Sequence, residues 1–162
     1  MQTFSGMRRN SSNPDYIRLF LAVVVFGLLQ ILSNSFIFFP TFPAVFFVYI
    51  VLNIDNEEKL LYILFSFLYL SFYELNKGFY LFSSLIFFII FYTVFVDKIR
   101  SSFTCKNCIL AVYVLSFYLG EFFVNALISY ILNREIPTFS TEYLYYMAFD
   151  FVVSVILFRN SV

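Results

Sequence analysis

Long apolar stretches, separated by short polar segments, dominate the pattern of this 162-residue chain. Within each stretch apolar and polar positions do not alternate, which favours helices over the strands of a membrane barrel. A helix crosses a hydrocarbon core of about 30 Å with about 20 residues. We therefore predict an all-α polytopic membrane protein with six transmembrane helices. The six stretches are residues 17–32, 36–53, 60–73, 79–96, 109–132 and 143–158.

The composition makes lipid the expected solvent for most of the chain. It is 62% hydrophobic and 12% charged, with 26 Phe residues and a mean hydropathy of +0.87. A soluble fold of this size could not bury so much apolar surface and still be covered by polar groups. Ten basic and ten acidic residues cancel, so nothing points to nucleic acid as a partner. The absence of His removes the usual general base and the commonest metal ligand.

The domain organisation is simple. Residues 1–15 are polar and predict a flexible cytoplasmic N-terminal tail, and residues 16–159 form a single six-helix transmembrane domain. Arg8 and Arg9 resemble the start of a signal peptide, but no cleavage site follows, so we expect an uncleaved first span.

Basic residues predict the orientation of the spans. With both termini in the cytoplasm, eight basic residues lie inside and only Lys77 and Arg134 lie outside. This bias indicates a multi-pass protein with both termini on the cytoplasmic side of its membrane. The eight are Arg8, Arg9, Arg18, Lys59, Lys98, Arg100, Lys106 and Arg159.

Two acids interrupt the last two apolar stretches. Glu121 and Asp150 lie near the centres of neighbouring, antiparallel spans, so we expect both carboxyl groups at similar depth. Asn125 and Ser154 follow them by one helical turn, on the same helix faces. Intramembrane acids often mark a proton or ion relay or a polar substrate pocket. The interpretation favoured here is a protonated acid that hydrogen-bonds a neighbouring helix, because no intramembrane base accompanies the pair.

Further polar and small residues fit a packing role. Ser116 and Gly120 form a small-xxx-small pair beside Glu121, which predicts close approach of another helix. Gln30 adds one polar group to the first span. We therefore expect Glu121 to be bonded within a packing seam that faces Asp150.

Known catalytic and metal-binding patterns are missing. The pair Cys105-x-x-Cys108 precedes the fifth span, but zinc needs two further ligands, which only a second copy of the chain could supply. Redox activity would need a thioredoxin-like context, so two reduced, inert thiols are expected. Residues 53–60, NIDNEEKL, read as a solvated loop or a docking point for a cytoplasmic protein. There is no phosphate-binding loop and no protease motif, so we expect no catalytic residue, cofactor or metal.

One segment carries a resemblance to a known family. The stretch SFLYLSFYELNKGFYL, residues 66–81, resembles the signature of the rod-shape-determining membrane protein MreD family. In that signature a Gly-Phe pair and a glycine precede an aspartate, and a Gly and a Leu-Gly pair follow. Ser66 and Phe67 stand at the Gly-Phe position, and Glu74 replaces the aspartate. Gly78 and Leu81 match the signature.

Other parts of the chain agree with the resemblance or depart from it. Leu70 and Phe82 occupy positions where the family has glycines, which puts close backbone approach there in doubt. The segment LLQI at 28–31 and the prolines after it are similar to the first hairpin of the family. The family can carry an acid similar to Glu121 in GEFFV.

The resemblance implies a function without chemistry. Members of the family are inner-membrane components of the elongation machinery of rod-shaped bacteria. They associate with the bitopic protein MreC, with the cytoplasmic actin-like MreB and with cell-wall synthases. Their fold is similar to that of the six-helix substrate-binding subunits of vitamin-uptake transporters. No catalytic residues come with the resemblance, and Glu74 and Gly78 are expected to shape a hairpin turn.

Three functions follow as hypotheses. The first is a scaffold of the cell-wall elongation complex, acting through helix packing. The second is a small-molecule (vitamin-type) binding subunit of a transporter, which should have convergent polar side chains open to the outer face. The third is a proton-coupled or lipid-handling membrane protein that uses Glu121 and Asp150. A closed, Phe-filled core would favour the scaffold.

Overall fold

The structure, a computed structural model, is all-helical in the residues that it describes. These are residues 40–138 and 141–161, with residues 21, 24–25, 27–28 and 31–32. The predicted N-terminal tail, most of the first apolar stretch and Gln30 lie outside the described residues. The α-helices are α2 (Pro43–Asn53), α3 (Leu60–Lys77), α4 (Ser83–Phe91), α5 (Asp97–Ser102), α6 (Lys106–Ile131) and α7 (Thr141–Phe158). The 3-10 turn η1 (Glu57–Lys59) precedes α3, and the π-helical segment η2 (Tyr92–Val96) joins α4 to α5.

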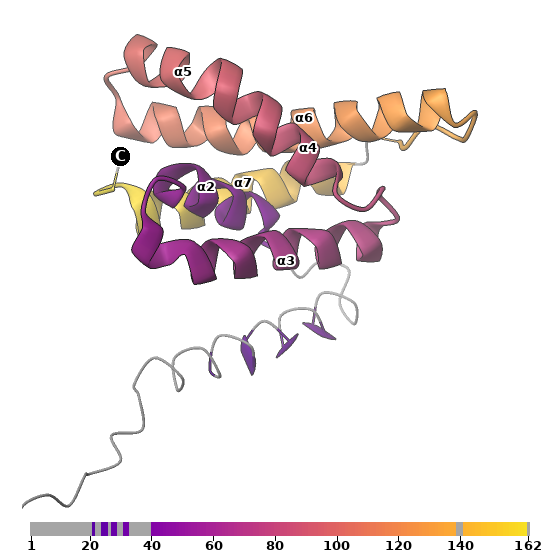
Figure 1. Ribbon diagram of the computed structural model, residues 1–162, viewed down its shortest axis with the longest axis horizontal. Helices are drawn as coiled ribbons and strands as arrows, with labels where there is room; N and C mark the ends of the chain where they lie inside the picture. Colours follow the sequence, from indigo (N-terminus) through magenta and orange to yellow (C-terminus); the bar gives the residue numbers. More distant parts are fainter. Residues whose placement is uncertain are drawn as a thin grey trace, which may run out of the picture.

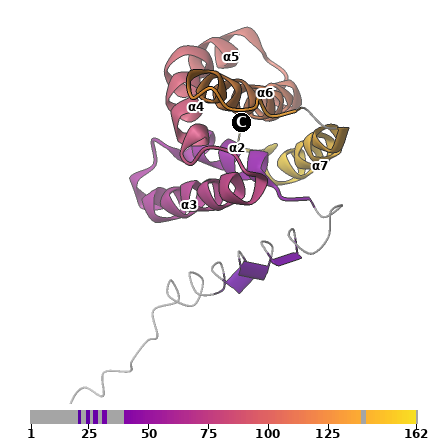
Figure 2. The same ribbon diagram turned by 90° about the vertical axis from the view of Figure 1, so that its right-hand side faces the viewer.

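Helix α2 is the centre of the bundle. It contacts α3, α6 and α7, and the views in Figures 1 and 2 both show it enclosed by longer helices. The second apolar stretch begins at residue 36, but α2 begins only at Pro43, whose fixed φ suits the first turn of a helix. With 11 residues, α2 is about 16 Å long. It is therefore too short to cross a hydrocarbon core of about 30 Å by itself.

Helix α3 is longer than its apolar stretch. The prediction ended it at residue 73, whereas it continues through Glu74 to Lys77 and stops at Gly78. The error has a physical cause, because the Glu74 side chain finds hydrogen-bond donors inside the protein and is fully buried. Gly78 ends the helix in the left-handed conformation with φ 71°, which glycine adopts without steric cost.

The fourth apolar stretch forms one long rod of helix rather than the predicted segment 79–96. The rod begins at Ser83 and runs through α4, η2 and α5 to Ser102 (Figure 1). The Thr93 hydroxyl donates to the carbonyl groups of Ile89 at 2.9 Å and Ile90 at 3.2 Å. Such bonds compete with the regular ladder of a helix, and the π-helical segment lies at this place.

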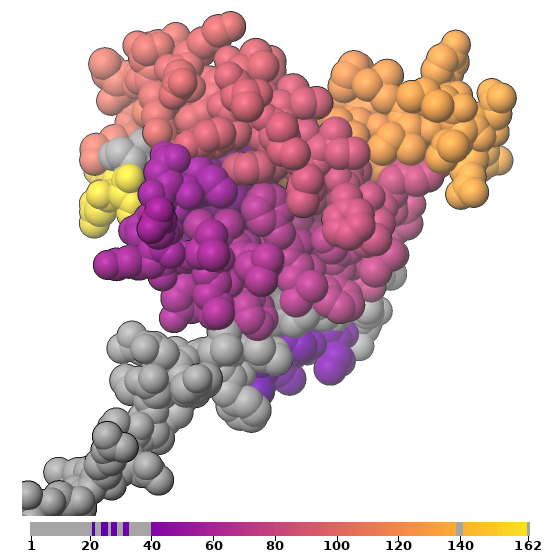
Figure 3. Space-filling view, viewed as in Figure 1, coloured from indigo at the N-terminus to yellow at the C-terminus, as the bar shows by residue number. Residues whose placement is uncertain are grey.

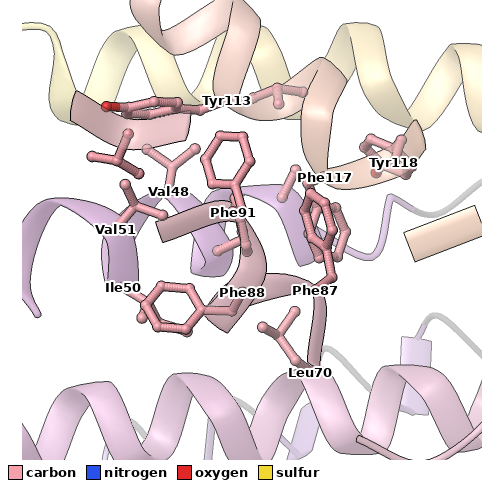
Figure 4. Close-up of a cluster of buried hydrophobic side chains, with 14 of the residues drawn as sticks. Val48, Ile50, Val51, Leu70, Phe87, Phe88, Phe91, Tyr113, Phe117 and Tyr118 are labelled. Carbon is pink, nitrogen blue, oxygen red and sulfur yellow. The ribbon is translucent and has the colours of Figure 1, made fainter. Parts of the chain in front are cut away.

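The core consists largely of aromatic rings. Phe47 of α2 packs against Phe87 of α4 and Phe117 of α6, with ring centroids 5.6 and 5.0 Å apart. Phe88 and Phe91 extend the same cluster, with centroids 6.1 and 5.5 Å from that of Phe47. Figure 4 shows these α4 rings between α2, α3 and α6. The spacings are those of favourable offset and edge-to-face ring pairs.

The outside of the bundle is strongly apolar. Large hydrophobic side chains are exposed on α3, α4, α6 and α7, and Figure 3 shows the end of α6 projecting beyond its neighbours. In the described residues two helices, α6 and α7, are long and apolar enough to cross a membrane. The all-α class is thus confirmed for these residues, and membrane association is indicated by the two helices.

Candidate functional site

Glu74 caps the start of α4. Its side chain is fully buried near the end of α3. The Phe82 N–H donates to Oε2 at 2.6 Å, and the Ser84 N–H donates to Oε1 at 2.5 Å. The Ser83 hydroxyl donates to Oε1 at 3.0 Å. Because the first N–H groups of a helix have no acceptor within that helix, the carboxyl group of α3 takes the role of N-cap for α4.

Gly78 allows the chain to reverse between the two helices. The Gly78 N–H donates to the Leu75 carbonyl at 3.3 Å, and the Phe79 N–H donates to the Glu74 carbonyl at 2.8 Å. This is the usual glycine C-cap, in which the left-handed residue lets the last carbonyl groups find donors. Glu74 and Gly78 therefore form the hairpin turn together, one through its side chain and one through its backbone.

The other signature residues lie on or near the same hairpin. Ser66 is buried, and its hydroxyl donates to the Tyr62 carbonyl at 2.9 Å. Phe67 packs edge-on against Phe88 of α4, with centroids 5.3 Å apart. Leu81 is exposed. Ser66 and Phe67 thus serve the packing of α3, about three helical turns before the hairpin turn at Gly78.

Asp150 caps α2 in the way that Glu74 caps α4. Its side chain is fully buried in α7, and Oδ2 accepts hydrogen bonds from the Ala44 N–H and the Tyr118 hydroxyl, both at 2.9 Å. Ala44 is the second residue of α2, and the residue before that helix, Phe42, has no side-chain acceptor. Phe42 and Phe82 both have positive φ, 55° and 67°, so each acid supports a helix that begins at a strained phenylalanine.

Glu121 is also buried, but its carboxyl group does not cap a helix. Its exposed fraction is 2%, and neither its Oε1 atom nor the hydroxyl of Tyr73 has a hydrogen-bond partner among the described residues. Both side chains line a narrow crevice beside Tyr118 that is too tight for a water molecule. The expectation of a bonded Glu121 is therefore wrong for Oε1. Asp150 Oδ2 binds the Ala44 N–H and the Tyr118 hydroxyl. Asp150 Oδ1, like Glu121 Oε1, has no hydrogen-bond partner among the described residues.

Asn125 connects α6 to the hairpin turn. It is 1% exposed, and its Oδ1 accepts from the Tyr80 N–H at 2.8 Å. Its Nδ2 donates to the Ser83 hydroxyl and to the Glu121 carbonyl, both at 2.9 Å. Since Ser83 also donates to Glu74, a continuous chain of hydrogen bonds runs from α6 to the end of α3.

The small residues beside Glu121 lie in a contact with α4. A Cβ atom at Gly120 would overlap the ring of Phe87, so the two helices approach closely at this point. Ser116 lies one turn earlier and is half-buried. Ser154, one turn after Asp150, is fully buried, and its hydroxyl has no partner in the described part of the chain.

A polar pocket of about 650 Å³ lies at the end of the bundle where the α3–α4 and α6–α7 connections meet. Lys77 and Arg134 line it with the acids Glu135 and Glu142. The Lys77 amine lies 5.0 Å from the ring centroid of Tyr146, within cation–π range. Asn125 also lines this pocket, so the pocket adjoins the hydrogen-bond chain described above.

Sequence reasoning singled out the acids but missed their partners. Tyr118 and Ser83 were not recognised, although a buried tyrosine hydroxyl usually requires an acceptor. Tyr118 lies three residues before Glu121, which could have drawn attention to it. The part played by the Tyr80 backbone N–H has no signal in the sequence, because any residue except proline could donate the bond there.

Comparison with protein-family models, with curated proteins and with solved structures finds no match to this chain. By its fold, the part of the chain that the structure describes is a helical bundle with two candidate membrane spans and a buried polar network that joins its helices.

Proposed function

We propose that this protein is a non-enzymatic, multi-pass component of the bacterial inner membrane. It acts as a scaffold in the complex that controls cell shape and cell-wall elongation. The proposal includes six spans with both termini in the cytoplasm, and partners of the MreC, MreB and cell-wall synthase types. It rests on the resemblance of residues 66–81 to the MreD signature and on how the buried polar groups are used.

The use of the buried acids is the observation that carries the proposal. The carboxyl groups of Glu74 and Asp150 accept the backbone N–H groups of other helices. Groups bound in this way hold helices in place. Together with the aromatic core around Phe47, this arrangement favours a packed scaffold over a relay between Glu121 and Asp150.

The distribution of basic residues supports the orientation. Lys77 and Arg134 line the same pocket at one end of the bundle. Lys59 and Arg100 both bond to the last turn of α2 at the other end, to the Asn53 side chain at 2.6 Å and to the Val51 carbonyl at 3.5 Å. If the end with Lys77 and Arg134 faces outward, the outside has only two basic residues of the sequence. The end with Lys59 and Arg100 then faces the cytoplasm, where the other basic residues are expected.

The outer face of α6 is the surface that we expect to meet a partner helix. Leu115, Leu119, Phe123 and Leu127 recur every four residues and are between 44% and 62% exposed. This spacing lines them up along one face of the helix. In a membrane such a stripe contacts either lipid or another helix, and a scaffold needs the latter.

A depletion experiment tests the cellular role. Lowering the amount of this protein in its own bacterium should turn rods into rounded cells, measured as the ratio of cell length to width. Wild-type protein supplied from a plasmid should restore rods. Cells that stay rod-shaped with no detectable protein would contradict the proposed function.

A cross-linking experiment tests the partner. A photo-reactive amino acid placed at Leu119 or Phe123 should capture a membrane protein of the cell-wall machinery. The matched control carries it at Val114, which is 1% exposed on the opposite face of the same helix. Capture of lipid alone at both exposed positions would remove α6 as the partner surface.

The polar pocket favours a second candidate function. Its charged and aromatic lining, at the end where the orientation puts the outer face, fits a small-molecule-binding subunit of a transporter. Native mass spectrometry of the purified protein would distinguish the two functions. A retained small molecule that disappears in an Arg134→Ala variant supports the binding subunit, whereas an empty protein with bound membrane partners supports the scaffold.

A further inference from the structure

The two cysteines lie at the start of α6, outside the apolar span. Cys105 is the N-cap residue, with an extended backbone conformation, and Cys108 lies in the first turn. The Cys108 N–H donates to the Cys105 sulfur at 3.4 Å. Both side chains are exposed. The sulfur of one cysteine thus lies over the backbone of the other, in a position that reagents from solution can reach.

The environments of the two thiols differ. Hydrogen bonding from the Cys108 side chain, assisted by the Cys108 and Asn107 backbone N–H groups, lowers the pKa of Cys105 from its usual value. The same side-chain bond raises the pKa of Cys108. Thiolates are the reactive form of cysteine, and Cys-x-x-Cys pairs at helix N-termini commonly have one activated thiol. Cys105 is therefore the better nucleophile of the pair.

We propose that Cys105 and Cys108 form a reversible dithiol–disulfide site at the N-terminus of α6. The Cys105 thiolate attacks a disulfide of the glutathione class, forms a mixed disulfide and releases one glutathione thiolate. The Cys108 thiolate then attacks the Cys105 sulfur and releases the second glutathione thiolate. Two protein thiols are oxidised by two electrons, the glutathione disulfide is reduced, and the two protons pass to the released thiolates or to solvent.

This inference replaces the expectation of two inert thiols. That expectation depended on the lack of a thioredoxin-like context, but the helix N-terminus and the bond to the Cys105 sulfur provide the local part of that context. A metal is a weaker interpretation, because no group of three metal-ligating side chains occurs in the described residues. Oxidation of Cys105 changes the N-cap of α6, because the sulfur atom that reacts is also the atom that caps the first turn of this helix.

The test uses the purified full-length protein in lipid nanodiscs. The protein is equilibrated with mixtures of reduced and oxidised glutathione, and its free thiols are then labelled with a maleimide polymer. The wild type should lose both labels together as the mixture becomes oxidising, with an intramolecular disulfide detected by peptide mass spectrometry. A reductant should restore both labels.

Single variants separate the two roles. Cys108→Ser should accumulate a mixed disulfide with glutathione on Cys105, because no resolving thiol remains. In the reduced wild type, a limiting amount of maleimide should label Cys105 before Cys108, as read by peptide mass spectrometry. Equal labelling of the two cysteines in the wild type, disulfides only between chains, or thiols released for labelling by a metal chelator would each overturn the proposal. None of these readouts depends on the proposed scaffold function.

Discussion

Removing the Glu74 carboxyl group tests whether this acid holds the α3–α4 hairpin together. In a Glu74→Ala variant, the Ser84 N–H loses its acceptor in a buried site, and the Phe82 N–H loses its acceptor in a part-buried one. The Ser83 hydroxyl also loses its acceptor but still accepts the bond from Asn125. The two backbone donors therefore carry most of the cost.

The magnitude follows from the bonds that are lost. A buried donor left without a partner costs about 1–3 kcal/mol, and a part-buried donor costs less, so the two backbone N–H groups predict a loss of about 2–4 kcal/mol in the free energy of unfolding. Glu74→Gln replaces one oxygen by an amide donor. Whichever way the amide turns, one N–H group then faces another donor, and a loss of about 1–3 kcal/mol is expected.

Unfolding of the purified protein in mixed micelles, titrated with a denaturing detergent and followed by circular dichroism, measures these differences. Glu57→Ala is the matched control, because Glu57 is exposed in η1 and its loss should change stability by no more than about 0.5 kcal/mol. The expected order of stability is wild type and Glu57→Ala, then Glu74→Gln, then Glu74→Ala. Equal midpoints for Glu74→Ala and Glu57→Ala would refute the capping role.

Three further substitutions test other parts of the bundle by the same unfolding assay. Gly120→Ala should destabilise by about 1–3 kcal/mol through overlap with Phe87, and a Phe87→Leu change should recover part of that loss, whereas independent effects would contradict the close contact. Asp150→Asn should be tolerated far better than Asp150→Leu, because an amide oxygen can keep both bonds of Oδ2; equal losses would show that the charge matters more. Gly78→Ala should cost about 1–2 kcal/mol from the positive φ alone, and a neutral result would mean that the helix end can change its conformation.

How much of this fold the sequence could predict depends on the range of each interaction. Apolar runs located the helices, because burial in lipid or in a core requires apolar residues over whole turns. The end of α3 was missed, since Glu74 looks like a helix-ending acid until its donors at residues 82–84 are known. The start of α4 was also missed. Phe82, the residue before this helix, is bulky and has a positive φ, which local preferences disfavour.

The sequence could predict which residues belong to the candidate site, but not which of them contact one another. Intramembrane position alone selected Glu121 and Asp150, since acids in apolar stretches are rarely without a role. The partner of Asp150 could not be inferred, because the Ala44 N–H is a backbone group with no sequence signature and lies 106 residues away. The hydrogen bond expected for Glu121 within its packing seam is missing at Oε1, which has no partner among the described residues.

The bond between Asp150 and Ala44 also sets an order for biogenesis. Helix α2 leaves the ribosome long before α7, so the start of α2 lacks its acceptor during most of synthesis. A short helix with an unsatisfied N-terminus is poorly placed in hydrocarbon by itself. The start of α2 can therefore reach its packed position only after α7 has been made. Completion of the described bundle then depends on the docking of α7 against α2.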